Sequence, residues 1–522
     1  MKGRLAKICF VLLVSSFGFA GNANPLKLPS IIIYGDVSDD ILIDTVKIEF
    51  WQKVLPGSKP PVPEEFLVPT APPNLFAGTP YSRSFYIEIP VTHGSGYLTI
   101  YARKRKDGML LPSINMFLAE AGDSVRIRFD FKNAAILFDG PAAEKFRCQQ
   151  ELFLSKSTEN FANGPVMFTT SSSVHNIKKT PEYLDALSRK DSLSTFIRLI
   201  EGTEGVLQLT KWELQKDLYS TRTWKILQAW SGKVPENFLN ILKANYLGEF
   251  RADILKTFVR YMKQSPQQFG KVYQELDRFL PETEFSENEI IHAPGYLDFI
   301  YQKSKIAAYI GKNSTVKYIS GNYNGQLRDM LLAKLVLEQF RRAENGTALL
   351  TEALAIAKTT WIRELLQDMY YKQATGQMAY NFSLPDDKGN IVNLSDLRGK
   401  TVLIDFWWTG CGACISFYKR IIQPAEKYFK DNPNFKIVTV SIDKDKKTWL
   451  ESLATNNYTS DNAINLYTEG QGHKHELIRH YNIPGYPHKL LIDKSGKIYK
   501  AGKLKLSNHK DFIQMIEEAM KQ

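Results

Sequence analysis

The pattern of apolar and polar positions changes twice along this chain of 522 residues. The first part holds short runs rich in Ile, Val, Phe and Tyr, and many of them alternate between apolar and polar side chains. This alternation is typical of half-buried strands, and the Pro-rich segments between the runs are typical of surface loops. We therefore expect an all-β, sandwich-like domain over residues 24–140.

The second part places apolar side chains at helical spacing. In the segment ADILKTFVRYM, for example, Ile254, Leu255, Phe258 and Met262 would share one face of a helix. We find neither a convincing fixed-period repeat nor a catalytic motif in this part. The pattern predicts a helical domain over residues 141–375 that acts as a spacer or binds a partner.

The third part alternates between strand-like and helix-like segments. TVLIDFWW and FKIVTVSID are continuous apolar runs, which are typical of strands covered on both faces of a sheet. The segment CISFYKRIIQPAEKYFKDN has the amphipathic spacing of a helix, and a hairpin-like segment and a closing helix end the chain. The alternation predicts an α/β domain over residues 376–522, with a central sheet flanked by helices.

The first residues have the three-part layout of a secretory signal peptide. The basic MKGRLAK precedes the apolar run ICFVLLVSSFGFA, and small residues follow, with candidate cleavage positions after Ala20 or Ala23. The run is shorter than the about 20 residues that span a membrane, and the alternative is a buried N-terminal helix. We expect residues 1–23 to be a signal peptide, so that its cleavage would remove Cys9. The mature protein would be exported, soluble and in an oxidising compartment.

The composition of the chain argues against a largely disordered protein and against a nucleic-acid-binding protein. Hydrophobic residues make up 43% of the chain and aromatic residues 12%, which argues against long disordered segments. The net charge is +12, but the basic residues are spread along the chain and no nucleic-acid-binding motif is visible. We therefore expect a solvated surface and no nucleic-acid partner, with weak attraction to an anionic membrane surface as the alternative.

Three cysteines remain after the signal peptide, namely Cys148, Cys411 and Cys414. Exported proteins that rely on structural disulfides usually carry more cysteines, at wider separations. Cys148 lies in a predicted helix, where a buried free thiol is the usual outcome. Cys411 and Cys414 stand at a predicted helix start, where unpaired N–H groups and a partial positive charge stabilise a thiolate. We expect Cys411 to be the nucleophile and Cys414 to attack the mixed disulfide.

Two other interpretations of the cysteine pair stay open. His473, His475, His480 and His488 fall in one window, so a site with two cysteine and two histidine ligands is conceivable, but no second cysteine pair exists for a usual zinc site. A purely structural disulfide would close a very short loop and gain little entropy. We expect a redox-active pair and no bound metal.

Three segments of the third part resemble the motifs of one protein family. VLIDFWWTGCGAC is similar to the active-site strand and helix start of thioredoxins, above all of the exported TlpA/ResA-type thiol-disulfide oxidoreductases. NIPGYPHKLLIDKSGKI resembles their cis-proline loop and the hairpin after it, and FSLPDDKGNIVNLSDLRGK resembles the segment that opens these exported members. The resemblance covers residues 376–522. It implies a thioredoxin fold with a mixed central sheet, a periplasmic location, disulfide exchange with protein cysteines and no cofactor.

The resemblance also implies roles in the chemistry. Cys411 matches the attacking cysteine and Cys414 the resolving one, and together they would form a redox-active disulfide. Asp405 falls on the buried acid that handles the proton of the resolving cysteine. A carboxyl group in an apolar strand has a raised pKa and can act as a base near neutrality. The alternative for Asp405 is a strand-end carboxylate that reaches water.

Four further residues are expected to bind the substrate. Pro487 matches the cis-proline that faces the cysteines in the family, and the backbone of Tyr486 would pair with the substrate chain. Trp407 matches an aromatic residue beside the site. Gly410 stands where thioredoxins often have Trp, which would widen access to the first cysteine. Pro484, which precedes a glycine, is the less favoured candidate for the cis bond.

The residues between and after the cysteines depart from the common patterns. Gly412 and Ala413 match neither the Gly-Pro of many reductants nor the histidine-containing pair of strong oxidants, so the direction of electron flow stays open. The resemblance favours reduction or isomerisation, with a membrane-linked thiol partner as electron donor. Members of the family often have a proline five residues after the second cysteine, which kinks the helix. This chain has Lys419 there, and we expect Pro424 to kink the helix instead.

Two other functions compete with disulfide exchange. A thioredoxin-fold peroxidase would normally have a proline and a threonine before its cysteine, where this chain has Ile404 and Trp408. A non-enzymatic envelope-binding or scaffold protein with a vestigial thioredoxin domain is the other alternative, since residues 24–375 carry no visible chemistry.

Overall fold

The computed structural model describes residues 29–38, 43–56, 63–76, 78–104, 110–111, 113–163, 166–169, 171–189, 197–214, 217–264, 269–278, 280–282, 284–343, 345–483, 485–502 and 508–522. The predicted signal peptide, with Cys9, lies outside these residues, as does Pro484. None of the described helices combines the length and the hydrophobicity that a membrane span requires. The chain divides into two compact units, Met1–Lys53 with Glu64–Ala143, and Val54–Pro63 with Glu144–Gln522.

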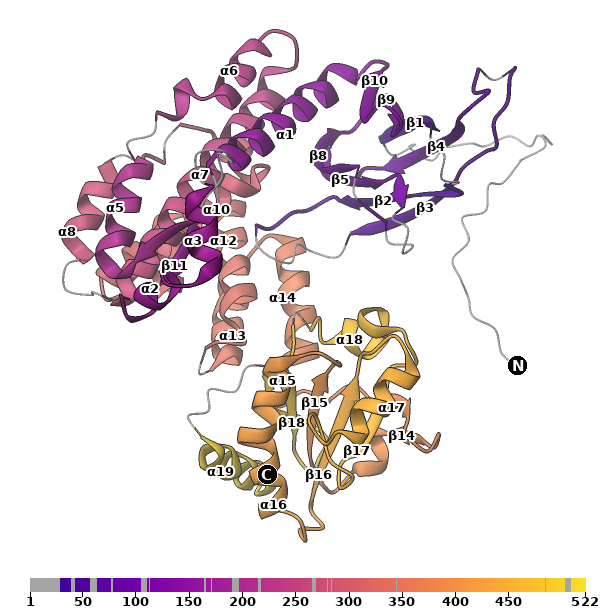
Figure 1. Ribbon diagram of the computed structural model, residues 1–522, viewed down its shortest axis with the longest axis vertical. Coiled ribbons are helices and arrows are strands. Elements are labelled where there is room, and N and C mark those ends of the chain that lie inside the picture. Colours follow the sequence, from indigo (N-terminus) through magenta and orange to yellow (C-terminus); the bar gives the residue numbers. More distant parts are fainter. Residues whose placement is uncertain are drawn as a thin grey trace. The chain divides into compact units, whose positions relative to one another are not determined.

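The first unit is built from strands, as its alternating pattern predicts (Figure 1). One sheet has the order β10-β9-β1-β4, in which β1 and β9 are parallel and the other neighbours antiparallel. A second sheet, of order β3-β2-β5-β8, is antiparallel throughout. The strands of the unit are β1 (Ser30–Ser38), β2 (Thr45–Trp51), β3 (Glu64–Pro69), β4 (Arg83–Pro90), β5 (Ser95–Tyr101), β6 (Arg103–Lys104), β7 (Leu110–Leu111), β8 (Ile114–Glu120), β9 (Ser124–Asp130) and β10 (Ala135–Asp139).

The middle part of the chain is mainly helical, as the helical spacing predicts. Ile254, Leu255 and Phe258 are buried on one of its helices. The short parallel pair of β11 (Val166–Thr169) and β12 (Arg198–Glu201) was not expected. The helices are α1 (Ala143–Asn163), α2 (Ser171–Ile177), α3 (Pro181–Ser188), α5 (Gly202–Leu214), α6 (Arg222–Ala229), α7 (Glu236–Gln264), α8 (Phe269–Arg278), α9 (Glu287–Ile291), α10 (Pro294–Ile310), α11 (Thr315–Asn322), α12 (Gly325–Gln339), α13 (Gly346–Ile356) and α14 (Thr360–Gln373).

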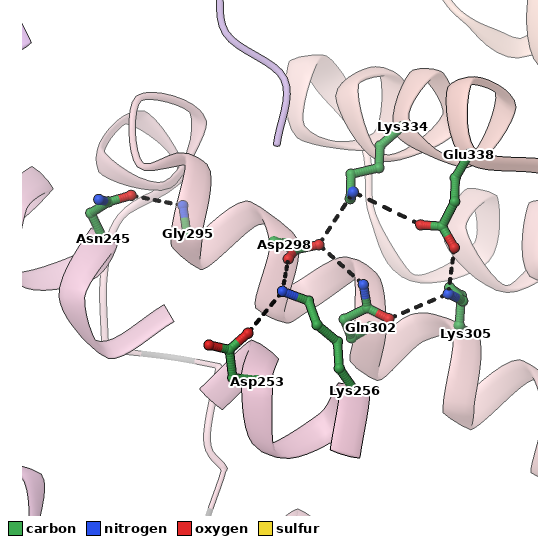
Figure 2. Close-up of polar contacts among 9 residues, drawn as sticks. All are labelled: Asn245, Asp253, Lys256, Gly295, Asp298, Gln302, Lys305, Lys334 and Glu338. Atoms are coloured by element: carbon green, nitrogen blue, oxygen red, sulfur yellow. Dashed lines mark hydrogen bonds and ion pairs between the residues drawn. The ribbon is translucent and has the colours of Figure 1, made fainter. Parts of the chain in front are cut away.

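Paired charges join three of these helices. Asp298 of α10 lies 3.3 Å from Lys334 of α12 and 3.0 Å from Lys256 of α7 (Figure 2). Glu338 of α12 pairs with Lys305 of α10 at 2.8 Å. Because Lys334 is only 6% exposed, these carboxylates take the place of the water that would otherwise solvate its ammonium group. The network therefore ties α7, α10 and α12 together.

The last part of the chain has a mixed five-stranded sheet of order β17-β16-β15-β18-β19. β15, β16 and β17 run parallel, whereas β18 and β19 pair antiparallel, so the expected mixed sheet is present. The strands here are β13 (Ser383–Pro385), β14 (Ile391–Asn393), β15 (Thr401–Trp407), β16 (Phe435–Ser441), β17 (Ile464–Tyr467), β18 (His488–Ile492) and β19 (Ile498–Gly502). The helices are α15 (Gly412–Phe417), α16 (Gln423–Tyr428), α17 (Lys446–Ala454), α18 (Glu476–His480) and α19 (His509–Met520).

The two central strands are covered on both faces. Every residue of β15 and β18 is buried, as their continuous apolar runs predict. Leu403 and Leu491 pack with side chains of α16 and α19. Ile404 and Leu490, the neighbours that point the other way, pack with side chains of α18. The end of β15 therefore emerges from a rigid core, and the cysteine pair follows it directly.

The helix after the cysteines runs from Gly412 to Tyr428 as the spacing predicts, but it contains a π-helical turn that the spacing does not predict. A π-helical turn, Tyr418–Ile422, separates α15 from α16. Pro424 is the second residue of α16. Proline has no N–H and its ring clashes with the carbonyl four residues earlier, which here belongs to Arg420 in the π turn. The widened turn thus lies where the proline would disturb a regular helix, which agrees with the kinking part expected of Pro424.

Candidate active site

Cys411 and Cys414 lie between β15 and the first turn of α15 and are joined by a disulfide, with their Cα atoms 5.2 Å apart. The Sγ atom of Cys411 accepts the backbone N–H of Cys414 at 3.1 Å. The exposed fraction is 6% for Cys411 and 2% for Cys414. Cys411 is therefore the more accessible of the two residues. An N–H that points at its sulfur would stabilise a thiolate there after reduction.

Aromatic rings enclose the disulfide. Trp407 stacks on Tyr458 with ring centroids 4.5 Å apart, and Trp449 stacks on Tyr467 at 4.9 Å. These four rings and both cysteines form one buried cluster, called the disulfide cluster below. Trp407 thus lies beside the pair, as expected. Trp449 and Tyr458 were missed, because nothing in the spacing of KTWLESLATNNY links them to distant cysteines.

Gly410 has a structural role that the sequence does not reveal. Its φ of +99° lies in the left-handed region, and a Cβ atom there would be 3.1 Å from the ring of Trp408. Its N–H donates to the hydroxyl of Tyr458 at 2.8 Å, and the preceding Thr409 is held by Asp443 through its N–H and its hydroxyl. The turn into the cysteine pair therefore requires a glycine at this position.

Asp405 lies on β15 and is only 2% exposed. Its Oδ1 atom has no hydrogen-bond partner in the part of the chain that the structure describes. The alternative that Asp405 reaches water at a strand end is therefore wrong. Burial raises the pKa of Asp405, because the charged form loses its hydration, and the positive charge of Lys489 opposes this rise.

Lys489 is a buried residue beside the site that the sequence pattern does not predict. It stands opposite Asp405 in the antiparallel pairing of β15 with β18 and is 3% exposed. Its Nζ atom lies 3.2 Å from the centre of the Phe417 ring of α15. Burial lowers the pKa of Lys489, and the carboxylate of Asp405 opposes this fall. The signal that could have found it is a lone lysine within the apolar run HKLLI.

The loop before β18 reaches the disulfide cluster. The peptide bond between Tyr486 and Pro487 is cis, as expected. The ring of Tyr486 packs against the disulfide cluster, and its hydroxyl lies 3.4 Å from Nδ1 of His473. Segments distant in the sequence, the β15–α15 turn and this loop, thus meet at one place.

The four histidines of the sequence window have separate surroundings. His473 contacts Tyr486, His475 accepts the N–H of Leu477 at the start of α18, and His480 packs against Tyr380. His488 is buried beside Phe406. Among the described residues, no three His, Cys, Asp or Glu side chains are grouped so that they could hold a metal ion. The histidine window therefore does not assemble with the cysteines into a metal site in this part of the chain.

Cys148 is a buried free thiol on α1, as predicted. Burial raises its pKa to about 12, so the thiolate is not populated near neutrality. Cys148 is therefore no candidate for a reactive thiolate.

Comparison with known proteins agrees with this geometry. Residues 399–498 match a protein family described as thioredoxin-like. The thiol-disulfide oxidoreductase ResA of Bacillus subtilis (strain 168) is 29% identical over 148 residues, which are 27% of this chain and 75% of ResA. ResA of Bacillus thuringiensis (strain Al Hakam) is 27% identical over 130 residues, 24% of this chain and 68% of that protein.

Two solved structures are each similar to less than a third of the chain. The thioredoxin domain of a thiol-disulfide oxidoreductase from Bacteroides vulgatus is 30% identical and covers 28% of this chain and 96% of its own, with a TM-score of 0.24. A thiol:disulfide interchange protein from Bacteroides sp. is 30% identical and covers 29% of this chain and 93% of its own, with a TM-score of 0.25. The C-terminal part of this chain is a thioredoxin-like thiol-disulfide oxidoreductase domain.

Proposed function

We propose that this protein is an exported, periplasmic enzyme that reduces or isomerises disulfides of other proteins through Cys411 and Cys414. The observation that supports the proposal most is the disulfide at the start of α15, with the cis-proline loop packed against the same cluster. A membrane-linked thiol partner would return the pair to the dithiol form. The enzyme would need no cofactor, because the two sulfurs carry the electrons.

The reaction is a pair of thiol–disulfide exchanges. The Cys411 thiolate attacks one sulfur of the substrate disulfide, so a mixed disulfide forms and the other substrate sulfur leaves as a thiolate. The Cys414 thiolate then attacks Sγ of Cys411, which releases the second substrate sulfur and forms the 411–414 disulfide. Two electrons pass from the enzyme to the substrate. The greater exposure of Cys411 supports this order.

Asp405 is proposed to accept the proton that Cys414 must lose before it attacks. Burial raises the pKa of this carboxyl, which brings it closer to that of a thiol and suits it to proton exchange near neutrality. Lys489 would tune this base, since its positive charge favours the ionised carboxylate.

The substrate is proposed to bind as an extended segment along the cis-proline loop. The backbone of Tyr486 would pair with the substrate chain, and Pro487 would hold the substrate sulfur near Cys411. The ring of Trp407 would pack beside the cysteine pair. The lack of a side chain at Gly410 would leave space for the substrate at the sulfur of Cys411. The contact of Tyr486 with the disulfide cluster supports this arrangement.

The organisation proposed for the whole chain is a signal peptide at 1–23, a sandwich-like domain at 24–140, a helical domain at 141–375 and the thioredoxin-like domain at 376–522. The two four-stranded sheets and the series of helices support the first two folded regions. The regions before residue 376 would dock partners or place the enzyme at an envelope surface.

Insulin reduction tests the proposed chemistry. The wild-type protein is expected to reduce insulin disulfides with a thiol as electron source, and Cys411→Ser to lose this activity. Cys148→Ala, which removes only the buried thiol, is the matched control and should keep it. A wild-type rate no higher than that of Cys411→Ser would overturn the proposal.

The reduction potential of the 411–414 disulfide tests the direction. A value close to the roughly −270 mV of thioredoxin supports a reductant, whereas one close to the roughly −120 mV of DsbA would make the protein an oxidant. Equilibration with glutathione buffers, followed by thiol alkylation, gives this value.

A further inference from the structure

The C-terminal turn of α18 leads directly into the cis-proline loop. The N–H of Asn482 donates to the carbonyl of Arg479, and the N–H of Ile483 donates to that of Ile478. Asn482 has a φ of +44°, so the turn has the hydrogen bonds and the left-handed residue of a Schellman motif. These two bonds satisfy the carbonyl groups of Arg479 and Ile478, whereas the carbonyl groups of Tyr481 and Asn482, which follow the helix, remain available to donors from outside the turn.

Arg341 supplies those donors from the helical region. Its Nη2 atom lies 2.8 Å from the carbonyl oxygen of Tyr481 and 3.0 Å from that of Asn482. The same nitrogen lies 2.9 Å from Oε1 of Gln373, the last residue of α14. A cation at this end of a helix also interacts favourably with the partial negative charge of the carbonyl groups. Arg341 lies outside residues 399–498, the part that matches the thioredoxin-like family.

The residues next to this contact are also held by the thioredoxin-like domain itself. Tyr481 is 1% exposed, and its hydroxyl accepts the N–H of Tyr380 at 2.8 Å. Ile483 is 3% exposed within the core between the sheet and α18. Only three residues separate Ile483 from Pro487, and Tyr486 packs against the disulfide cluster. A shift of the turn would therefore move the substrate-binding loop relative to the cysteines.

We propose that Arg341 is a positioning residue for disulfide exchange, which holds the end of α18 and thereby fixes the Tyr486–Pro487 loop against Cys411 and Cys414. The proposal rests on the proposed function. It gives the helical region a direct part in substrate binding, since a side chain from outside the thioredoxin-like domain completes the support of its active-site loop.

The test compares Arg341→Ala with Arg342→Ala in the full-length protein. Arg342 is the neighbouring, exposed residue, so its replacement removes the same charge without the contact. For Arg341→Ala we expect the KM for insulin to rise about tenfold, because misplacement of a binding loop weakens the alignment of a large substrate. The rate at which the reduced enzyme reacts with the small disulfide DTNB, which does not need the loop, should stay within about twofold of wild type.

A second readout does not depend on activity. Hydrogen–deuterium exchange of peptides that cover residues 477–490 should be faster in Arg341→Ala and unchanged in Arg342→Ala, because the turn loses its outside donor. Arg341→Lys, which keeps the charge but not the planar group of donors, should lie between wild type and Arg341→Ala in both KM and exchange. Should Arg341→Ala fail to fold, Arg341→Lys carries the comparison.

Two results would overturn the proposal. One is an unchanged KM for insulin in a folded Arg341→Ala protein. The other is an equal loss of the insulin and DTNB reactions, which would indicate general damage to the thiol site. Failure of the proposed function is a different result, since wild type would then reduce insulin no faster than Cys411→Ser, whereas the exchange measurement would still report on the loop.

Discussion

Asp405 and Lys489 are buried opposite each other, so the charge of each depends on the other. Replacement of Lys489 by Met removes the positive charge that opposes the effect of burial, and the pKa of Asp405 should rise further. Since Asp405 must be ionised to take the proton of Cys414, the acid side of the pH–rate profile for insulin reduction should move to higher pH, by about one unit. Rates measured between pH 5 and 9 check this.

Two further variants serve as controls for the pH–rate profile of Lys489→Met. Lys494→Met removes an exposed lysine just after β18 and should leave the profile unchanged. Asp405→Asn removes the base, and the rate at neutral pH should fall about 10²-fold. In the Asp405→Asn background, Lys489→Met should no longer shift the profile. A shift that persists there would mean that Lys489 acts on another group.

Gly410 and Gly412, two residues apart, offer a matched pair of substitutions. Gly410→Ala places a Cβ atom in a left-handed conformation and against the ring of Trp408, so it should lower the free energy of unfolding by about 1–2 kcal/mol. Gly412 begins α15, and a Cβ atom there would meet nothing within 4 Å. Gly412→Ala should therefore be neutral or stabilising. Urea denaturation of the oxidised protein compares the two, and equal losses would contradict the argument.

At the scale of elements, the ion pairs between α10 and α12 can be tested through the stability of the protein and through the dependence of that stability on pH (Figure 2). Burial alone would raise the pKa of Asp298, but Lys334 and Lys256 outweigh it and lower the pKa. Lys334→Met leaves the half-buried carboxylate of Asp298 without one of its two lysine partners, so the free energy of unfolding should fall by about 1–3 kcal/mol at neutral pH. Chemical denaturation of the variant and the wild type measures this.

The lowered pKa of Asp298 also determines how the stability of Lys334→Met should change with pH. A carboxyl group with a lowered pKa stabilises the fold above its unfolded pKa of about 3.9, and this stability is lost as the pH falls through the lowered value. In Lys334→Met the pKa of Asp298 rises, so acid unfolding should begin at higher pH than in wild type. Asp253→Asn, whose side chain is 74% exposed, is the control and should cost less than about 1 kcal/mol. Equal effects of the two variants would exclude a special contribution of the buried network.

The elements that the sequence predicts well are those with a local signal. The run TVLIDFWW is apolar throughout, and the strand that it forms is buried throughout. The position of the cysteine pair after this strand follows from the same pattern. The π turn before α16 was missed, because hydrophobic spacing alone does not distinguish a π turn from a regular helical turn. Lys489 was missed because antiparallel pairing, not proximity in the chain, brings it opposite Asp405.

At the scale of the whole molecule, the sequence predicts the order of strand-rich, helical and α/β parts, but it does not predict contacts between parts. Periodicity describes one element at a time. The contact of Arg341 with the carbonyl groups of Tyr481 and Asn482 joins residues that are more than a hundred positions apart. Only the three-dimensional structure brings such a contact to light.

Two truncated chains test whether the helical region supports the thioredoxin-like domain. The chain 376–522 keeps the cysteine pair but lacks Arg341 and Gln373, so its α18 turn loses its outside donor. It should react with DTNB like the full chain, whereas its KM for insulin should rise about tenfold. The chain 144–522 keeps both residues and should retain the KM of the full chain. If 144–522 behaved like 376–522, the support would come from the strand-rich unit, and the role assigned to Arg341 would fall with it.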